Sequence, residues 1–253
     1  MTVRGTLDSE QRMAALREDL ERSGALLLND TARTWGVHPM TIRRDFERLE
    51  RAGLARRVRG GIISSAGEGF EARANRFLGA KKTIARKLAP LVVDQAAIGM
   101  DASTTVFRLI EGLHGASGLS VITNGINAFE ALHAVPGVRA FITGGEREEH
   151  NVSLVGTLAV KALAQFNLDR CFLSCAAVDP ETGSSETTIE QAAIKEAMSA
   201  AASEVVLAVS SDKLGSRSRV RSLPLNQIDV LVTELEPTDP RLDPYRDSVS
   251  LIL

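Results

Sequence analysis

Short apolar runs alternate with segments of helical periodicity through most of the chain after residue 80. Buried strands are expected at residues 97–100, 119–122, 138–142, 170–173, 205–209 and 230–233. Helices are expected at residues 81–91, in the segments that end at Leu113 and His133, and at residues 189–201. Because strands that alternate with helices form mostly parallel sheets covered on both faces, this pattern predicts an α/β domain.

Polar residues follow three successive strands of this expected sheet. Ligands of parallel sheets bind beyond the carboxyl ends of the strands, and hydroxyl and backbone N–H groups at a helix start bind anions. Taken alone, a Ser or Thr at a helix start is more often a plain cap, and a Gly-Gly pair is more often a turn. Their repetition at one sheet edge predicts a phosphate-binding site, to which Lys213, after a further strand, adds positive charge. The other candidate residues are Asp101, Ser103, Thr104, Thr105, Asn124, Gly125, Gly144 and Gly145.

The first sixty residues differ in charge from the rest of the chain. They hold 12 arginines and nine acidic residues, whereas the remainder holds 18 basic and 23 acidic residues. Between Arg33 and Arg59 there are eight arginines and three acidic residues. The net charge of −2 therefore hides a basic N-terminal part, which is typical of a chain whose N-terminus alone contacts a polyanion.

Three short helices are expected in this basic part. The first begins near Ser9 and ends before Gly24. The second is capped by Asn29 or Asp30 and ends at Gly36. These two helices precede the third, whose sequence says most about function.

The third helix starts with a proline, which fits a first helical turn because its missing N–H needs no partner there. Ile42, Phe46 and Leu49 recur at spacings of four and three residues and form one apolar face. The opposite side and flank carry Met40, Thr41, Arg43, Arg44 and Arg48. A helix of this kind fits the major groove of DNA, where Arg reads guanine and the Thr methyl group contacts thymine.

A basic hairpin is expected at residues 54–63. Its arginines would place positive charge on a wing over the DNA backbone. An arginine-rich amphipathic helix alone is usually a solvated surface, but here two helices precede it and the hairpin follows. The combination predicts a winged helix-turn-helix domain. Its candidate DNA-binding residues are His38, Met40, Thr41, Arg43, Arg44, Arg48, Arg56, Arg57 and Arg59.

The motif Thr41-Ile42-Arg43-Arg44-Asp45-Phe46, with Leu49-Glu50, Arg57 and Gly60-Gly61, resembles the DNA-binding signature of the DeoR family of bacterial sugar-metabolism regulators. His38 stands where the family usually has a capping Ser, Arg59 where it has His, and Ser210 where it often has Asp. The resemblance continues at Lys81, Ile84-Ala85, Asp101, Ser103 to Thr105, Thr123-Asn124, Gly144-Gly145, Ser153, Gly156, Lys195 and Ile228-Asp229.

This resemblance implies a fold and a function for both parts of the chain. It implies a larger sensor domain similar to ribose-5-phosphate isomerase, with that enzyme's phosphate-binding Ser/Thr loop, and it adds Lys81 to the candidate effector-binding residues. The implied function is sequence-specific DNA binding by a repressor of a carbohydrate-utilisation operon, released from DNA by a phosphorylated sugar. The expected partners are double-stranded DNA with operator half-sites, the sugar effector, and further copies in a homo-oligomer, a dimer or a tetramer.

The expected domain boundaries follow from the same patterns. Residues 1–63 form the winged helix-turn-helix, residues 64–69 are a small, polar linker, and residues 70–253 form the sensor and oligomerisation domain.

The main alternative is a sugar-phosphate isomerase or deaminase fused to a DNA-binding domain. Isomerisation needs a carboxylate base beside the substrate carbon, and the isomerases of the implied fold carry an acidic Ala-Asp-Glu stretch after the relevant strand. Ala176 and Ala177 stand in that region, and Asp179 and Glu186 are displaced from it. We therefore expect a regulator without catalytic residues. A purely architectural DNA-binding protein would not explain a second domain with an anion-lined edge.

The content of cysteine, histidine and apolar residues argues against a disulfide framework, a zinc site and a membrane span. Cys171 and Cys175 are too few for a disulfide framework, and the four histidines lie too far apart to complete a zinc-ligand spacing. We expect a cytoplasmic protein without metal or cofactor. We also expect no signal peptide and no membrane span, because no run reaches the ~18 apolar residues that a span needs.

Overall fold

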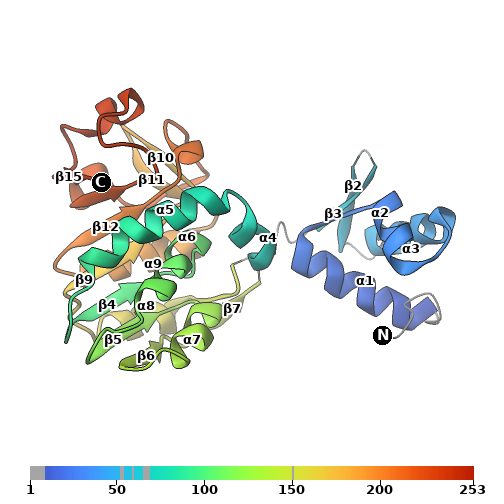
Figure 1. Cartoon of the computed structure of the whole chain (residues 1–253), viewed down its shortest axis with the longest axis horizontal. Coiled ribbons are helices and arrows are strands. Elements are labelled where there is room, and N and C mark those ends of the chain that lie inside the picture. Colours follow the sequence, from blue (N-terminus) through green and yellow to red (C-terminus); the bar gives the residue numbers. More distant parts are fainter. Residues whose placement is uncertain (1–8, 52–53, 59, 65–68, 150) are drawn as a thin grey trace. The chain divides into compact units, whose positions relative to one another are not determined.

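The computed structural model of the chain describes residues 9–51, 54–58, 60–64, 69–149 and 151–253 (Figure 1). Two compact units divide between Arg76 and Phe77. The first unit thus includes a helix, Phe70–Asn75, that the sequence analysis assigned to the second domain. Ser64 ends a strand of the first unit, and residues 65–68 of the expected linker lie outside the described residues.

The first unit is a winged helix-turn-helix. Its core contains Leu16 and Leu20 of the first helix, Trp35 of the second, and Ile42 and Leu49 of the third. The strands form an antiparallel sheet in the order β1-β3-β2, in which β2 and β3 make the wing hairpin. Its elements are α1 (Ser9–Ser23), β1 (Ala25–Leu27), α2 (Leu28–Trp35), α3 (Pro39–Arg51), β2 (Ala55–Val58), β3 (Gly61–Ser64) and α4 (Phe70–Asn75).

The second helix begins earlier than predicted. It starts at Leu28 after an extended Leu27, and no side chain caps its N-terminus, so the predicted caps Asn29 and Asp30 are wrong. Its end at Gly36 is confirmed: this glycine has φ 64° and ψ 31°, a left-handed conformation that closes helices and favours glycine.

The second unit is built on a parallel sheet of seven strands, in the order β15-β14-β12-β9-β4-β5-β6. The predicted α/β architecture is confirmed, and the six predicted strands are all members of this sheet. They are β4 (Ala97–Met100), β5 (Leu119–Thr123), β6 (Val138–Ile142), β9 (Arg170–Leu173), β12 (Val205–Ala208) and β14 (Val230–Val232), joined at the edge by β15 (Leu251–Ile252).

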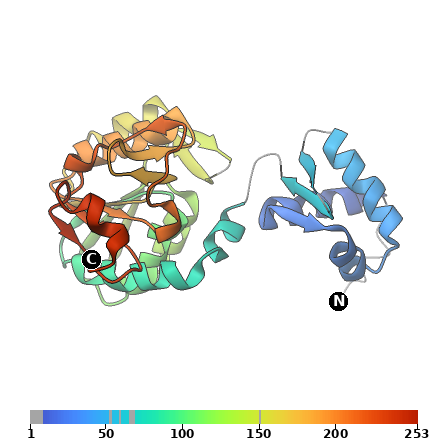
Figure 2. The same cartoon turned by 90° about the horizontal axis from the view of Figure 1, so that it is seen from above.

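Two apolar layers sandwich this sheet. Cys171 and Leu173 of β9 pack in one core cluster with α8 and α9, whereas Phe172 between them packs in the other with α5 and α7. This alternation is the period of two that a strand buried on both faces shows. Helices accordingly lie on both sides of the sheet in Figure 2. The helices are α5 (Leu78–Leu88), α6 (Thr104–Phe107), α7 (Ile126–His133), α8 (Thr157–Leu163) and α9 (Ile189–Ala200), with short 3-10 turns η2 (Ala89–Leu91), η3 (Arg108–Gly112), η4 (Ser211–Lys213), η5 (Leu225–Gln227) and η6 (Pro240–Tyr245).

Two smaller sheets were not predicted. They are the hairpin of β7 (Glu146–Glu148) and β8 (Ser153–Val155), and the antiparallel sheet of β10 (Ala177–Asp179), β11 (Gly183–Glu186) and β13 (Val220–Arg221). These strands have two to four residues and are rich in Ser, Glu and Arg, so they lack the apolar alternation that would predict them.

The strand order has a topological switch point between β4 and β9. From β4 the chain proceeds through β5 to β6 on one side, and from β9 it proceeds through β12 and β14 to β15 on the other. The loops that leave β4 and β9 therefore diverge to opposite sides, and such a switch point is where parallel sheets bind ligands.

Candidate functional site

Helix α3 presents a basic surface. Ile42, Phe46 and Leu49 are buried in the first unit, while Arg43, Arg44 and Arg48 are exposed. Met40 is 49% exposed and Thr41 is half-buried. The structure thus places the predicted groove-facing residues opposite the apolar face of α3.

His38 fills the capping position of α3. Its ring Nδ1 accepts a hydrogen bond from the Met40 N–H at 3.2 Å, and its carbonyl accepts from the Thr41 N–H at 2.9 Å. An imidazole nitrogen therefore takes the place that a Ser oxygen has in the family signature, and it accepts from one of the N–H groups at the helix start.

Asp45 fastens α3 to α1 from the inside. Its carboxylate pairs with Arg12, at 2.6 Å from Nε and 3.3 Å from Nη2, and its side chain is 3% exposed. This bidentate pair fixes the rotation of the recognition helix. No local pattern predicts Arg12 as the partner of Asp45, because the two residues are 33 positions apart in the sequence.

The arginines of the first unit differ in how they are held. Arg57 of the wing pairs with Glu47 at 2.8 Å and Glu50 at 3.4 Å, so it ties the wing to α3. Arg48 donates to the Ser9 hydroxyl at 2.6 Å. Within the described part of the chain, no hydrogen bond or ion pair holds Arg44, whose guanidinium is exposed. Arg59 and the Arg56 side chain lie outside the described residues.

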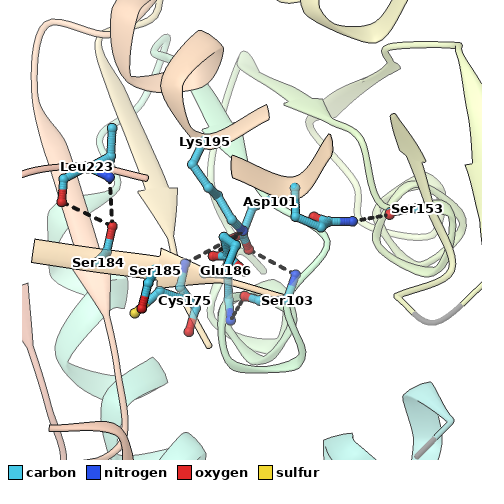
Figure 3. A network of polar contacts seen from close by, with 12 residues as sticks. Asp101, Ser103, Ser153, Cys175, Ser184, Ser185, Glu186, Lys195 and Leu223 are labelled. Atoms are coloured by element: carbon cyan, nitrogen blue, oxygen red, sulfur yellow. Dashed lines mark hydrogen bonds and ion pairs between the residues drawn. The ribbon is translucent and has the colours of Figure 1, made fainter. Parts of the chain in front are cut away.

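Asp101 is the centre of a polar network at the carboxyl ends of β4 and β9 (Figure 3). It is fully buried, and its Oδ1 accepts from the Ser103 N–H at 2.9 Å. Its Oδ2 accepts from the Ser174 N–H at 2.7 Å and forms an ion pair with Lys195 of α9. The carboxylate therefore joins the loops after β4 and β9 to helix α9, and its predicted contact with an effector stays a prediction.

The loop after β4 carries the predicted hydroxyl groups. Ser103 caps α6, since its Oγ accepts from the Val106 N–H at 3.2 Å. Thr104 and Thr105 are buried, and the buried ammonium of Lys81 donates to the Thr104 hydroxyl at 3.0 Å. The structure thus brings Lys81 of α5 to the Ser/Thr loop, and its role in effector binding stays a prediction.

Lys213 reaches the same edge from η4. Its Nζ donates to the Cys175 carbonyl at 2.6 Å and to the Ser174 hydroxyl at 3.3 Å. Since the Ser174 N–H bonds Asp101, Lys213 is one residue removed from the centre of the network. Two contacts hold its loop: Ser211 bonds the Glu234 carboxylate, and the Gly215 N–H donates to the Tyr245 hydroxyl at 2.8 Å.

Asn124 and Gly125 border this centre from β5. A Cβ on Gly125 would lie 2.9 Å from the Cα of Ala102, so the glycine allows the loops after β4 and β5 to approach closely. Asn124 is buried and donates to the Leu154 carbonyl at 3.1 Å, whereas its Oδ1 has no hydrogen-bond partner among the described residues.

Gly144 and Gly145 lie farther away, at the end of β6. This strand is two positions from β4, roughly 10 Å across the sheet. Both glycines have positive φ, 71° and 118°, and a Cβ on Gly145 would lie 2.5 Å from the Val155 carbonyl oxygen. Among the described residues no hydrogen bond or ion pair joins them to the Asp101 network, and their predicted role in effector binding stays a prediction.

Sequence reasoning missed three members of the network: Ser174, Lys195 and Glu186. Glu186 was expected to be displaced, but its Oε1 lies 4.0 Å from the Lys195 ammonium, and burial raises the pKa of its carboxyl to about 7. Burial alone would lower the pKa of Lys195, but the carboxylates of Asp101 and Glu186 outweigh it, so the pKa is raised. The family match at Lys195 was the available signal, whereas Glu186 lies on a strand that no pattern predicted.

The cysteines carry no reactive signature. Cys171 and Cys175 are free and buried, and burial raises the pKa of the Cys175 thiol to about 12. Thiols in this state are poor nucleophiles.

In the described residues no three His, Cys, Asp or Glu side chains gather as metal ligands, and no described helix is both long and apolar enough to cross a bilayer.

A winged helix-turn-helix with an exposed basic recognition helix, together with an α/β domain, defines a DNA-binding transcription regulator. The chain belongs to the DeoR family: residues 12–67 match the DeoR-like helix-turn-helix domain, and residues 77–235 match the DeoR C-terminal sensor domain.

The chain is similar to transcription regulators over most of their length. The regulator GolR of Listeria innocua is 28% identical, over 85% of this chain and 86% of that protein. The repressor GlcR of Bacillus subtilis is 28% identical over 96% of both chains. A putative aga operon repressor of Escherichia coli O157:H7 is 26% identical, over 89% of this chain and 86% of that protein.

Solved structures show more distant similarity. Ribose 5-phosphate isomerase A from Neisseria gonorrhoeae is 16% identical with a TM-score of 0.37, over 55% of this chain and 53% of that chain. The beta subunit of eIF2B from Chaetomium thermophilum is 13% identical with a TM-score of 0.47, over 94% of this chain and 68% of that chain.

Proposed function

We propose that this regulator is a repressor of a carbohydrate-utilisation operon and that a phosphorylated sugar, bound where β4 and β9 end, releases it from DNA. The observation that carries the proposal is the convergence of two lysines on one polar loop system. Lys81 bonds Thr104 after β4, and Lys213 bonds Ser174 and Cys175 after β9. Ammonium groups beside hydroxyl groups suit a phosphate, because each can donate a charge-assisted hydrogen bond to it.

The names of relatives support the same class of effector. One of them is the glycerol-3-phosphate regulon repressor of Escherichia coli, which is 25% identical over 90% of this chain and 91% of that protein and whose name includes a phosphorylated compound. In this proposal the protein acts in the cytoplasm as a dimer or tetramer, because one winged helix reads too few bases for useful specificity. Sugar binding would then favour one of two arrangements of the DNA-binding units.

The effector would be bound and not converted. Asp101 already serves Lys195 and two backbone N–H groups, and Ala176 and Ala177 supply no base after β9. The buried Glu186 is the one observation that favours an isomerase or deaminase. A turnover assay with pentose and hexose phosphates separates the two functions, and product formation at an enzymatic rate would contradict the proposal.

The decisive experiment combines effector titration with a DNA-release assay on Lys213→Ala. Charge-assisted hydrogen bonds contribute about 1.5–3 kcal/mol, so sugar-phosphate affinity is expected to fall at least ~10-fold. The variant should bind its operator as the wild type does, but it should no longer be released. Lys161→Ala, which removes an exposed lysine of the same unit, is the matched control. Unchanged affinity in both Lys213→Ala and Ser103→Ala would remove the phosphate site.

A further inference from the structure

Glu186 is a buried carboxylate that lacks a hydrogen-bond partner at one oxygen. It ends β11, its side chain is 9% exposed, and its Oε1 accepts no hydrogen bond from the described residues. A buried acceptor left without a donor is unfavourable, because it has lost its water and gained nothing in return. A missing donor is therefore expected at this position.

The neighbours of Glu186 do not supply that donor. Lys195 of α9 is the nearest cation, at 4.0 Å from Oε1, and its ammonium is already engaged by Asp101 of the β4 loop. Lys213 of η4 also acts on Glu186 electrostatically, but its hydrogen bonds go to Ser174 and Cys175 in the loop after β9. Cys175 is protonated because of its burial, but its thiol makes no hydrogen bond to Oε1. Asp101, whose negative charge helps to raise the pKa of Glu186, has only acceptor oxygens.

We propose that Glu186 determines effector specificity by accepting, at Oε1, a hydrogen bond from a hydroxyl group of the sugar phosphate. The inference rests on the proposed function and assigns the other end of the ligand. A phosphate does not suit this position, because two anionic groups would repel each other. An ammonium group is disfavoured by Lys195, which already places a positive charge beside the carboxylate. A neutral hydroxyl donor satisfies the oxygen at no electrostatic cost.

The strand of Glu186 is joined to the loop of Lys213, so the two ends of the proposed site have a set spacing. The preceding residue, Ser185, accepts a hydrogen bond from the Ser218 N–H at 2.8 Å and donates to the Ala177 carbonyl at 3.3 Å. The Ser216 N–H in the same loop donates to the Val178 carbonyl at 3.4 Å. A phosphate held at Lys213 and a hydroxyl held at Glu186 would therefore measure the length of the effector.

The test compares two variants of the full-length protein by calorimetric titration. Glu186→Gln keeps an acceptor oxygen in nearly the same shape, and Glu186→Leu removes it. The probes are inorganic phosphate, glycerol 3-phosphate, ribose 5-phosphate, fructose 6-phosphate and glucose 6-phosphate. For the tightest sugar phosphate, Glu186→Leu is expected to weaken binding at least about tenfold and Glu186→Gln about threefold. The affinity for inorganic phosphate should stay unchanged in both.

A pH series distinguishes a direct contact with the sugar from a purely structural role, because a structural role would leave the ratio of wild-type to Glu186→Gln affinity independent of pH. The ionised carboxylate is the better acceptor, so the ratio of wild-type to Glu186→Gln affinity should rise between pH 6 and 8. The second ionisation of the phosphate, with a pKa of about 6, affects both proteins alike and cancels in this ratio. A flat ratio would contradict the inference.

The outcomes separate this inference from the proposed function. If Glu186→Leu binds the sugar phosphate as the wild type does while Lys213→Ala does not, the role of Glu186 is wrong and the phosphate site stands. If Glu186→Leu loses inorganic phosphate as well, Glu186 supports the whole site and does not select the hydroxyl. If no sugar phosphate binds to the wild type, both the proposed function and the inference fail.

Discussion

Asp101 and Lys195 form a buried ion pair that ties the loop after β4 to helix α9 across 94 residues of sequence. Their side chains are 0% and 7% exposed, so neither charge is well solvated. Removing one member of such a pair leaves the other charge buried without compensation. The ion pair therefore supports the loops on which the proposed effector site depends.

Lys195→Met is expected to destabilise the second unit by about 3–5 kcal/mol. Asp101→Asn added to it should recover part of that loss, because the double variant buries no isolated charge. Far-UV circular dichroism during urea unfolding measures the change. The single tryptophan, Trp35, is buried in the first unit, so its fluorescence transition serves as an internal control and should not shift. Equal loss in the single and double variants would show that the two charges are not coupled.

Arg44→Ala and Arg57→Ala should affect DNA binding differently. Arg44 is exposed on α3 and free to reach a base, so its loss should cost about 1–3 kcal/mol on the operator and reduce the preference over random duplex. Arg57 lies on the wing, and its loss should weaken binding to all sequences alike and flatten the salt dependence.

Binding to operator and random duplex across a salt series distinguishes these two effects. Because Arg57 pairs with both Glu47 and Glu50, Glu47→Gln is a useful companion: it removes the shorter of the two ion pairs and should strengthen phosphate contact. Arg86→Ala, in the second unit, is the control for a simple loss of charge. Operator binding by Arg44→Ala at wild-type strength would show that α3 is not the reading helix.

Tyr245→Phe should loosen the loop of Lys213 without touching the proposed phosphate contacts. The Tyr245 hydroxyl accepts from the Gly215 N–H at 2.8 Å and donates to the Val178 carbonyl at 3.0 Å. Losing both bonds is expected to destabilise the second unit by about 1–3 kcal/mol. Sugar-phosphate affinity should fall while operator affinity stays. Calorimetry and thermal unfolding measure the two effects, and unchanged values in both would exclude a role for this hydroxyl.

Glu186 should make the second unit less stable as the pH rises. Its folded-state pKa of about 7 lies above the ordinary value of 4.5, so the folded chain holds a proton that the unfolded chain releases between these values. The stabilisation is full below pH 4.5 and is lost as the pH approaches 7, by roughly 3 kcal/mol for a shift of this size. Glu186→Gln should therefore raise the melting temperature more at pH 8 than at pH 5. An equal effect at both pH values would contradict the raised pKa.

Local patterns explain which elements were predictable. The runs predicted at residues 97–100, 138–142 and 170–173 match β4, β6 and β9 residue for residue, because short, mostly apolar segments between turns are typical of strands in a parallel sheet. The faces of α3 followed from helical periodicity in the same way. The predicted cap of α2 was wrong, because α2 follows β1 directly: Leu27 ends the strand and Leu28 begins the helix, so no side chain caps its N-terminus.

The sequence by itself determined the alternating α/β order, the basic winged helix and the polar residues at the strand ends, because each depends on neighbours within a few positions. Only the tertiary structure decided which of these polar residues meet. The strand order places β9 beside β4 and so brings Ser174, Lys195 and Glu186 to Asp101, while β6 leaves Gly144 and Gly145 two strands away. Such contacts depend on the order of the strands in the sheet and on which charged side chains are buried together. Neither can be predicted from the periodicity of the sequence.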